Sequence, residues 1–201
     1  PLALYFFLYS MHSSYSLVNL SLAAQQMLET EQAFTYLEQA FRIKQELKDK
    51  LGIATVYFYF GDLNIYLKAY KTALLNFHKN IEILNALDFQ HKILESHFSI
   101  AYIYLLQGKE KAALDYLYLY FNPKEDLKKL KKIECLFKTY LRMYYILIAN
   151  NQKESVEMLA VLYDFLQKQA EKISDTSLKY SFLHQIAANK EILDLYQNKK
   201  R

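Results

Sequence analysis

The feature that most constrains this chain is an alanine that recurs every 40 residues, at Ala33, Ala73 and Ala113. Repetition at a period of about 20 to 50 residues is typical of a solenoid of stacked helices. Two helices approach within about 8 Å only where one of them presents almost no side chain. The alanines therefore mark predicted helix contacts. A small residue precedes each alanine and a large apolar residue follows it, at Ser21, Gly61 and Ala101 and at Leu37, Phe77 and Leu117.

The composition favours helices throughout. The chain has only 3 Gly and 2 Pro, too few for a sheet protein rich in tight turns. A hydrophobic content of 53% excludes general disorder. Each unit of the repeat holds two amphipathic runs of about 14 to 17 residues, and short turn-like stretches separate these runs at 29–31, 68–70 and 107–109. The sequence therefore predicts an all-α fold of helix pairs. Residues 116–121 alternate like a strand, but their alignment with 36–41 and 76–81 favours a helix.

The order of small, apolar, aromatic and alanine positions resembles the tetratricopeptide repeat, in a longer variant with an extended second helix. The tryptophan-like position holds Leu17, Tyr57 and His97, and the tyrosine-like position holds Ala24, Asn64 and Tyr104. The chain departs from the family because it has no Trp, no proline closes a repeat, and the second alanine position holds Ala40 but then Asn80 and Tyr120. The resemblance implies a right-handed superhelix of about four helix pairs with a C-terminal capping helix.

The pattern divides the chain into three parts. Residues 1–12 are predicted to be the end of a preceding helix or a truncated repeat, in a chain that looks like a piece of a longer protein. Residues 13–171 form the array, and residues 172–201 form the capping helix and a basic tail. Within the last part, Ser174 and Asp175 predict the N-cap of a helix from about Thr176 to about Tyr196. The predicted repeats are 13–50, 51–90, 91–122 and a degenerate 127–171, in which Ser155 replaces the alanine and Leu159 the aromatic residue.

No catalytic constellation is found in the sequence. A phosphate-binding loop needs clustered glycines, but Gly52, Gly61 and Gly108 are scattered. His91 and His97 are six residues apart and face different sides of a helix, so they do not form a zinc pair. His97 occupies the tryptophan-like position, which favours a hydrogen-bonded core histidine. We therefore expect no enzyme activity, no metal site and no cofactor.

The charge and the cysteine content of the chain bear on its partners and its cellular location. The net charge of +4 is mild, and acidic neighbours dilute the basic run at 124–132, so no direct nucleic-acid partner is expected. No apolar stretch is long enough to span a bilayer, so no membrane partner is expected either. The single Cys135 is predicted to be a buried, inert thiol that forms no intrachain disulfide. A reducing, cytoplasmic location follows as an expectation.

A binding surface is expected on the first helix of each pair, because these helices line the inside of a solenoid. Aromatic side chains there suit an extended peptide or an amphipathic helix. Two alternatives stay open: the aromatic residues pack against the next repeat, or a capping helix folds back into the groove. For Asp62, position alone leaves open whether its side chain is solvated, locally bonded or a polar anchor for ligand. The predicted groove residues are Phe58, Asp62, Ile65, Phe98, Tyr102, Leu105, Tyr140 and Tyr144.

These features predict a non-catalytic module that binds a protein or a peptide. The inward positions lack the lysines and asparagines with which some tetratricopeptide repeats grip a chaperone C-terminus, so that ligand is disfavoured. Two other functions stay open. In the first, the array is the ligand-sensing arm of a larger bacterial signalling protein, because residues 173–193 look like the closing stretch of arrays in signalling ATPases and transcription regulators. In the second, it is a self-associating scaffold and forms a homodimer.

Overall fold

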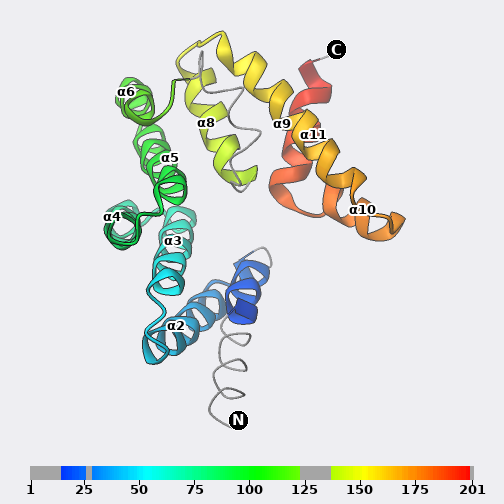
Figure 1. The fold of residues 1–201 in the computed structure, drawn as a ribbon. Helices are drawn as coiled ribbons and strands as arrows, with labels where there is room; N and C mark the ends of the chain where they lie inside the picture. The colour runs from blue at the N-terminus through cyan, green and yellow to red at the C-terminus, as the bar shows by residue number, and fades with distance from the viewer. Residues whose placement is uncertain (1–14, 26–28, 123–136, 200–201) are drawn as a thin grey trace. The chain divides into compact units, whose positions relative to one another are not determined.

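The computed structural model describes residues 15–25, 29–122 and 137–199, and these parts are entirely α-helical or connecting turns (Figure 1). They contain ten helices that pack as sequential neighbours, an arrangement consistent with a helical repeat. The predicted all-α class is therefore confirmed. The helices are residues 15–25, α2 (Thr30–Glu46), α3 (Lys50–Tyr66), α4 (Tyr70–Ala86), α5 (Gln90–Leu106), α6 (Glu110–Tyr120), α8 (Phe137–Ala149), α9 (Glu154–Glu171), α10 (Thr176–His184) and α11 (Ala187–Lys199).

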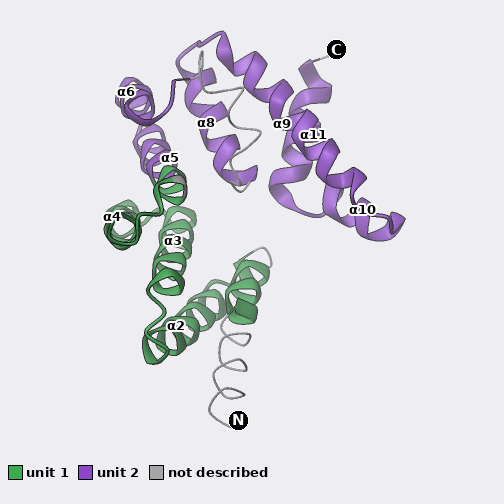
Figure 2. Cartoon of the chain, viewed as in Figure 1, with its two compact units in different colours: residues 1–96 green, residues 97–201 purple. Residues whose placement is uncertain are grey.

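Contacts divide the chain into two compact units, Pro1–Ser96 and His97–Arg201, and the boundary falls inside α5 (Figure 2). In the first unit α3 packs against both α2 and α4. In the second unit α8 packs against α6, α9 and α11. Both α3 and α8 are thus the central helices of their units.

One backbone joint recurs between successive helices. The residue two positions after the helix end adopts a left-handed conformation, at Lys48, Lys68, Asp88 and Gly108, with φ between 54° and 73°. At the first joint, the amide of Lys48 donates to the carbonyl of Gln45 at 3.0 Å and the amide of Asp49 donates to that of Lys44 at 2.9 Å. This pair of bonds is the Schellman motif, which satisfies the last carbonyls of a helix. The joint repeats every 20 residues, so it connects helices within pairs and between pairs alike.

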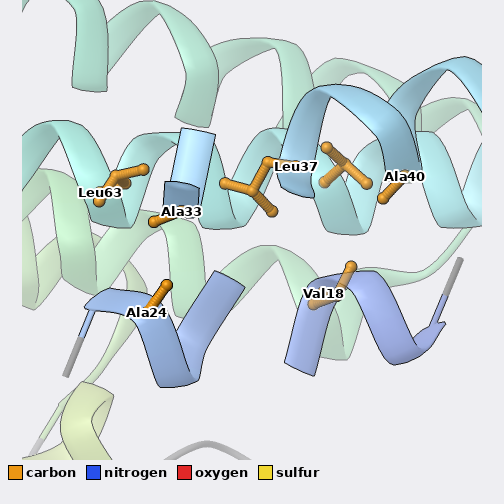
Figure 3. Close-up of a cluster of buried hydrophobic side chains, with 7 residues drawn as sticks. Val18, Ala24, Ala33, Leu37, Ala40 and Leu63 are labelled. Atoms are coloured by element: carbon orange, nitrogen blue, oxygen red, sulfur yellow. The ribbon is translucent and has the colours of Figure 1, made fainter. Parts of the chain in front are cut away.

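The recurring alanines lie where the repeat requires them. Ala33, Ala73 and Ala113 are fully buried, as the packing argument predicts. Figure 3 shows Ala33 and Ala40 of α2 facing Ala24 and Val18 of the helix over residues 15–25. Leu37, Val56 and Leu63 complete this cluster of buried side chains. Miniature side chains thus bring the backbones of neighbouring helices together.

The small residue and the large residue of the second pair are in direct contact. Gly61 on α3 faces Phe77 on α4, and a Cβ atom at position 61 would lie 2.7 Å from Cε1 and Cζ of that ring. Phe77 is fully buried, so the ring cannot move aside freely. The largest side chain of its series therefore faces the smallest one.

Two buried polar links replace apolar packing in the first unit. Asn80 occupies the second alanine position of its repeat; its Nδ2 donates to the carbonyl of Ala54 at 2.7 Å, and its Oδ1 accepts from Ser96 Oγ at 2.8 Å. Lys44 is also buried, and its Nζ lies 2.8 Å from Asp49 Oδ2 and 3.9 Å from the centre of the Tyr15 ring. These bonds explain how polar residues are accommodated among helix contacts.

The C-terminal segment differs from the sequence prediction. Asp175 is the N-cap, as predicted, and its Oδ1 accepts from the Leu178 amide at 2.8 Å. However, the single helix expected from about Thr176 to about Tyr196 is wrong, because the chain turns at 185–186 and forms α10 and α11. Asn189 Nδ2 donates to the carbonyl of Phe182 at 2.8 Å and fastens the two helices across that turn.

Residues 116–121 follow the helical interpretation rather than the strand. α6 continues to Tyr120, and only Phe121 adopts an extended backbone. Several expectations lie outside the described residues: those for the N-terminal segment 1–12, the basic run at 124–132 and Cys135.

Candidate functional site

The three groove residues predicted in the first unit are buried side chains of α3. Phe58, Asp62 and Ile65 expose 6%, 3% and 7% of their surface. The Phe58 ring packs edge-on against the Phe77 ring, with 5.6 Å between the centroids. Phe77 lies in the same predicted repeat as Phe58 and not in the next one. Contact of the three residues with a ligand stays a prediction.

The five groove residues predicted in the second unit fall into two groups. Phe98, Tyr140 and Tyr144 are buried; Phe98 packs against Phe121 with ring centroids 5.7 Å apart. Tyr102 and Leu105, near the end of α5, are only partly buried. Of the eight predicted residues, these two keep side-chain surface that a ligand could contact in the structure as it stands.

Arg142 on α8 holds Tyr102 in place and was missed by the sequence analysis. Its side chain is buried, and Nη1 donates to Ser99 Oγ at 2.6 Å. The guanidinium lies 5.6 Å from the centre of the Tyr102 ring, within the range of a cation–π contact. The sequence does single out Arg142, because it is the one charged residue in the apolar run from Tyr140 to Leu147. A buried charge in such a run needs partners, and Ser99 and Tyr102, which lie on α5, are among those of Arg142.

Tyr59 and two carboxylates make an acidic corner in the first unit. Burial raises the pKa of Tyr59, and the charges of Asp62 and Glu95 raise it further, to about 12. Tyr59 and Asp62 lie on α3, and Glu95 lies on the first part of α5.

An aromatic patch joins α5 to α6 in the second unit and consists of His97, Tyr104, Tyr116 and Tyr120. The rings of His97 and Tyr120 stack with centroids 3.5 Å apart and planes 11° apart. His97 Nδ1 lies 3.0 Å from the Tyr116 hydroxyl, so His97 is a hydrogen-bonded core histidine, as predicted. Burial and the neighbouring Tyr120 and Tyr104 raise the pKa of Tyr116. The patch borders an exposed stretch of α6, in which 72% of Leu119 is accessible.

The aromatic patch accounts for two departures from the repeat pattern at once. His97 stands at the tryptophan-like position and Tyr120 at the second alanine position. The two rings stack on each other, and Tyr120 keeps 40% exposure, whereas Ala40 at the same position of the first repeat is fully buried. The sequence analysis noted both departures separately but could not pair them, because a helix pattern alone does not show which side chains meet.

The described residues hold no group of three or more His, Cys, Asp or Glu side chains placed to bind a metal ion. No helix in the parts of the chain that the structure describes is long and apolar enough to cross a bilayer.

No protein-family model matches the chain, and a search of curated proteins finds no significant match.

Proposed function

We propose that this chain is a non-catalytic module that binds a protein or a peptide, built on a tetratricopeptide-like repeat of the long form. The 40-residue recurrence of buried alanines supports the repeat, together with the contact between Gly61 and Phe77. Repeats of this kind present a continuous series of first helices, which suits an elongated ligand. The same binding surface would serve the sensing arm of a larger signalling protein.

The observation that carries this proposal is the partly exposed Tyr102 with its buried support. The buried Arg142 guanidinium, which is itself bonded to Ser99, lies 5.6 Å from the centre of the Tyr102 ring and restrains it, so Tyr102 loses little freedom when a ligand covers it. A tyrosine also offers a large apolar face with a polar end, the combination enriched at binding hot spots. Leu105, one helical turn further on, adds apolar surface beside it.

The test is a selection of displayed random peptides on the full chain, followed by affinity measurements on variants. We expect Tyr102→Ala to weaken the selected peptides at least about tenfold, the loss of a typical hot spot. Leu119→Ala is the matched surface control, because Leu119 is exposed on α6, and it should leave the affinity unchanged. Circular dichroism of each variant verifies that helicity is retained.

Two outcomes would contradict this assignment. If Leu119→Ala abolishes binding and Tyr102→Ala does not, the ligand docks on the exposed face of α6. If the selection enriches no peptide above an unrelated helical protein, the peptide-binding function itself is wrong. Phe98→Ala is unsuitable as the main variant, because Phe98 is fully buried and its loss leaves a cavity.

A further inference from the structure

The last helix of the described chain lies on the face of the fourth pair. α11 packs against both α8 and α9, and all three helices belong to the second unit (Figure 2). α8 is the helix on which the sequence placed the groove residues Tyr140 and Tyr144, and both are now buried. The chain thus covers part of α8 with its own last helix.

Two contacts fasten α11 near its middle and its end. The Tyr145 hydroxyl of α8 donates a hydrogen bond to Oε1 of Glu191. Five residues later the Tyr196 ring stacks on Tyr163 of α9, with centroids 3.9 Å apart and planes 10° apart. Both contacts are made by single side chains at the margin of the helix, where water can compete for them.

The apolar anchoring of α11 is small. Its buried side chains are Asn189, Ile192 and Leu193, and Asn189 bonds to α10 rather than to α8 or α9. α10, which precedes it, buries none of its side chains. By contrast, α9 buries six side chains along its length: Ser155, Met158, Leu159, Leu162, Leu166 and Ala170. Segments with few buried contacts open locally before the rest of a domain unfolds.

We propose that α11 is a displaceable occupant of the α8–α9 face and stands in for a helix of the binding partner. This proposal goes beyond the proposed function, because it concerns the α8–α9 face and not Tyr102: the α8–α9 face is closed while α11 is docked and open when α11 leaves. The side chains with which α11 contacts α8 and α9 indicate which side chains a competing helix must carry. A competing helix carries a carboxylate for Tyr145, two aliphatic residues directly after it, and an aromatic ring five residues after the carboxylate for Tyr163.

Hydrogen exchange of the full wild-type chain tests the opening without any partner. We expect the amides of 187–199 to exchange at least tenfold faster than those of the central turns of α9, in a local step that leaves α9 protected. Equal protection of α11 and α9 would overturn the proposal, because α11 would then open only when the whole unit unfolds.

A second measurement tests whether the vacated face accepts a helix. The probe is a fluorescent peptide of residues 187–199, titrated into the full chain carrying Glu191→Ala and Tyr196→Ala. The peptide should bind this variant at least tenfold more tightly than it binds the wild-type chain, whose face is occupied. The same peptide with both replacements should not bind either chain. Absence of binding to the variant, with its α8 and α9 still protected from exchange, would also overturn the proposal. Neither result depends on whether a foreign peptide binds Tyr102, so the two proposals fail separately.

Discussion

Gly61 and Phe77 illustrate how single side chains set the distance between paired helices. The corresponding positions in the third repeat hold Ala101, which is larger than glycine, and Leu117, which is smaller than phenylalanine, and all four residues are buried. The combined side-chain volume of the two positions is thus similar in both repeats, although it is divided differently between them. Close-packed interiors accept such exchanges far better than a change on one side alone.

We expect Gly61→Ala to destabilise the chain by about 1–2 kcal/mol, because the new Cβ meets the Phe77 ring and overpacking outweighs the gain in helix propensity. Adding Phe77→Leu to Gly61→Ala recreates the combination of the third repeat and should recover most of that loss. Urea unfolding of Gly61→Ala, Phe77→Leu and the double variant gives three free energies of unfolding, and these measure the coupling energy between the two positions. Additive effects would show that the two residues do not compete for one space.

The pair formed by Lys44 and Asp49 makes a second prediction at this scale. Burial would raise the pKa of Asp49, but the Lys44 ammonium and the Gly52 amide outweigh burial and lower it. Asp49→Asn leaves the buried ammonium without its charge partner, so we expect a loss of about 3 kcal/mol. Lys44→Met should cost less, about 1 kcal/mol, because the Asp49 side chain keeps 27% exposure and can be hydrated.

The pH dependence checks the same pair. A lowered pKa contributes stability above the ordinary value of 3.8 and loses it as the pH falls through the folded value. Thermal unfolding in acid should therefore show a shallower decline for Asp49→Asn than for the wild-type chain. An identical acid profile for both would mean that the pair is not formed in solution.

At the scale of the helix, the recurring joint places L-residues in a conformation that they adopt reluctantly. Lys48, Lys68 and Asp88 have φ values of 54°, 59° and 59°, and only the fourth position of the series carries glycine. A non-glycine residue there costs about 1–2 kcal/mol, which the two Schellman bonds offset.

Replacing Lys68 by glycine should therefore stabilise the chain by about 0.5–1 kcal/mol, since the relief of strain exceeds the added entropy of the unfolded chain. Glu82→Gly, at an exposed position within α4, is the matched control and should cost about 1 kcal/mol. Chemical denaturation of the two variants gives both values. Lys68→Ala should not increase the free energy of unfolding. An increase in this variant would mean that the lysine charge, and not the backbone conformation, destabilises the wild-type chain.

At the scale of the whole molecule, partly buried tyrosines make the fold sensitive to alkali. The pKa of Tyr59 is raised to about 12, and those of Tyr116 and Tyr145 are raised by burial and by their polar neighbours. Raised values mean that the folded state holds these protons more tightly than the unfolded state. The stability they provide is complete below pH 10, the ordinary value, and is lost as the pH rises through the folded values.

We expect the denaturation midpoint to be constant from about pH 8 to pH 9.5 and to fall steeply above pH 10, in step with tyrosinate absorbance. Tyr59→Phe should reduce that slope, because it removes one of the perturbed groups and leaves the ring. A flat midpoint up to pH 11 would show that these hydroxyls are hydrated.

The sequence predicted the repeat well and the site less well, for a physical reason. Burial of Ala73 follows from its period alone, because a recurring small residue among large ones has few other uses. The burial of Phe58 and Tyr140 could not be predicted, since a helix that is apolar on all sides gives no indication of which side faces a neighbour. The break between α10 and α11 also carried no Gly or Pro signal; the bond from Asn189 to Phe182 that spans it is visible only in three dimensions.

The joint that repeats every 20 residues also bears on how such a chain can change its length. Its last residue both closes one helix and begins the next, as Asp49 does between α2 and α3. One inserted residue within a helix would turn every later side chain by about 100° and misplace each alanine that follows. Duplication of a complete 40-residue stretch would preserve every contact. Gene growth in whole pairs is therefore the route open to a protein built in this way, and its natural variants should differ in length by multiples of that stretch.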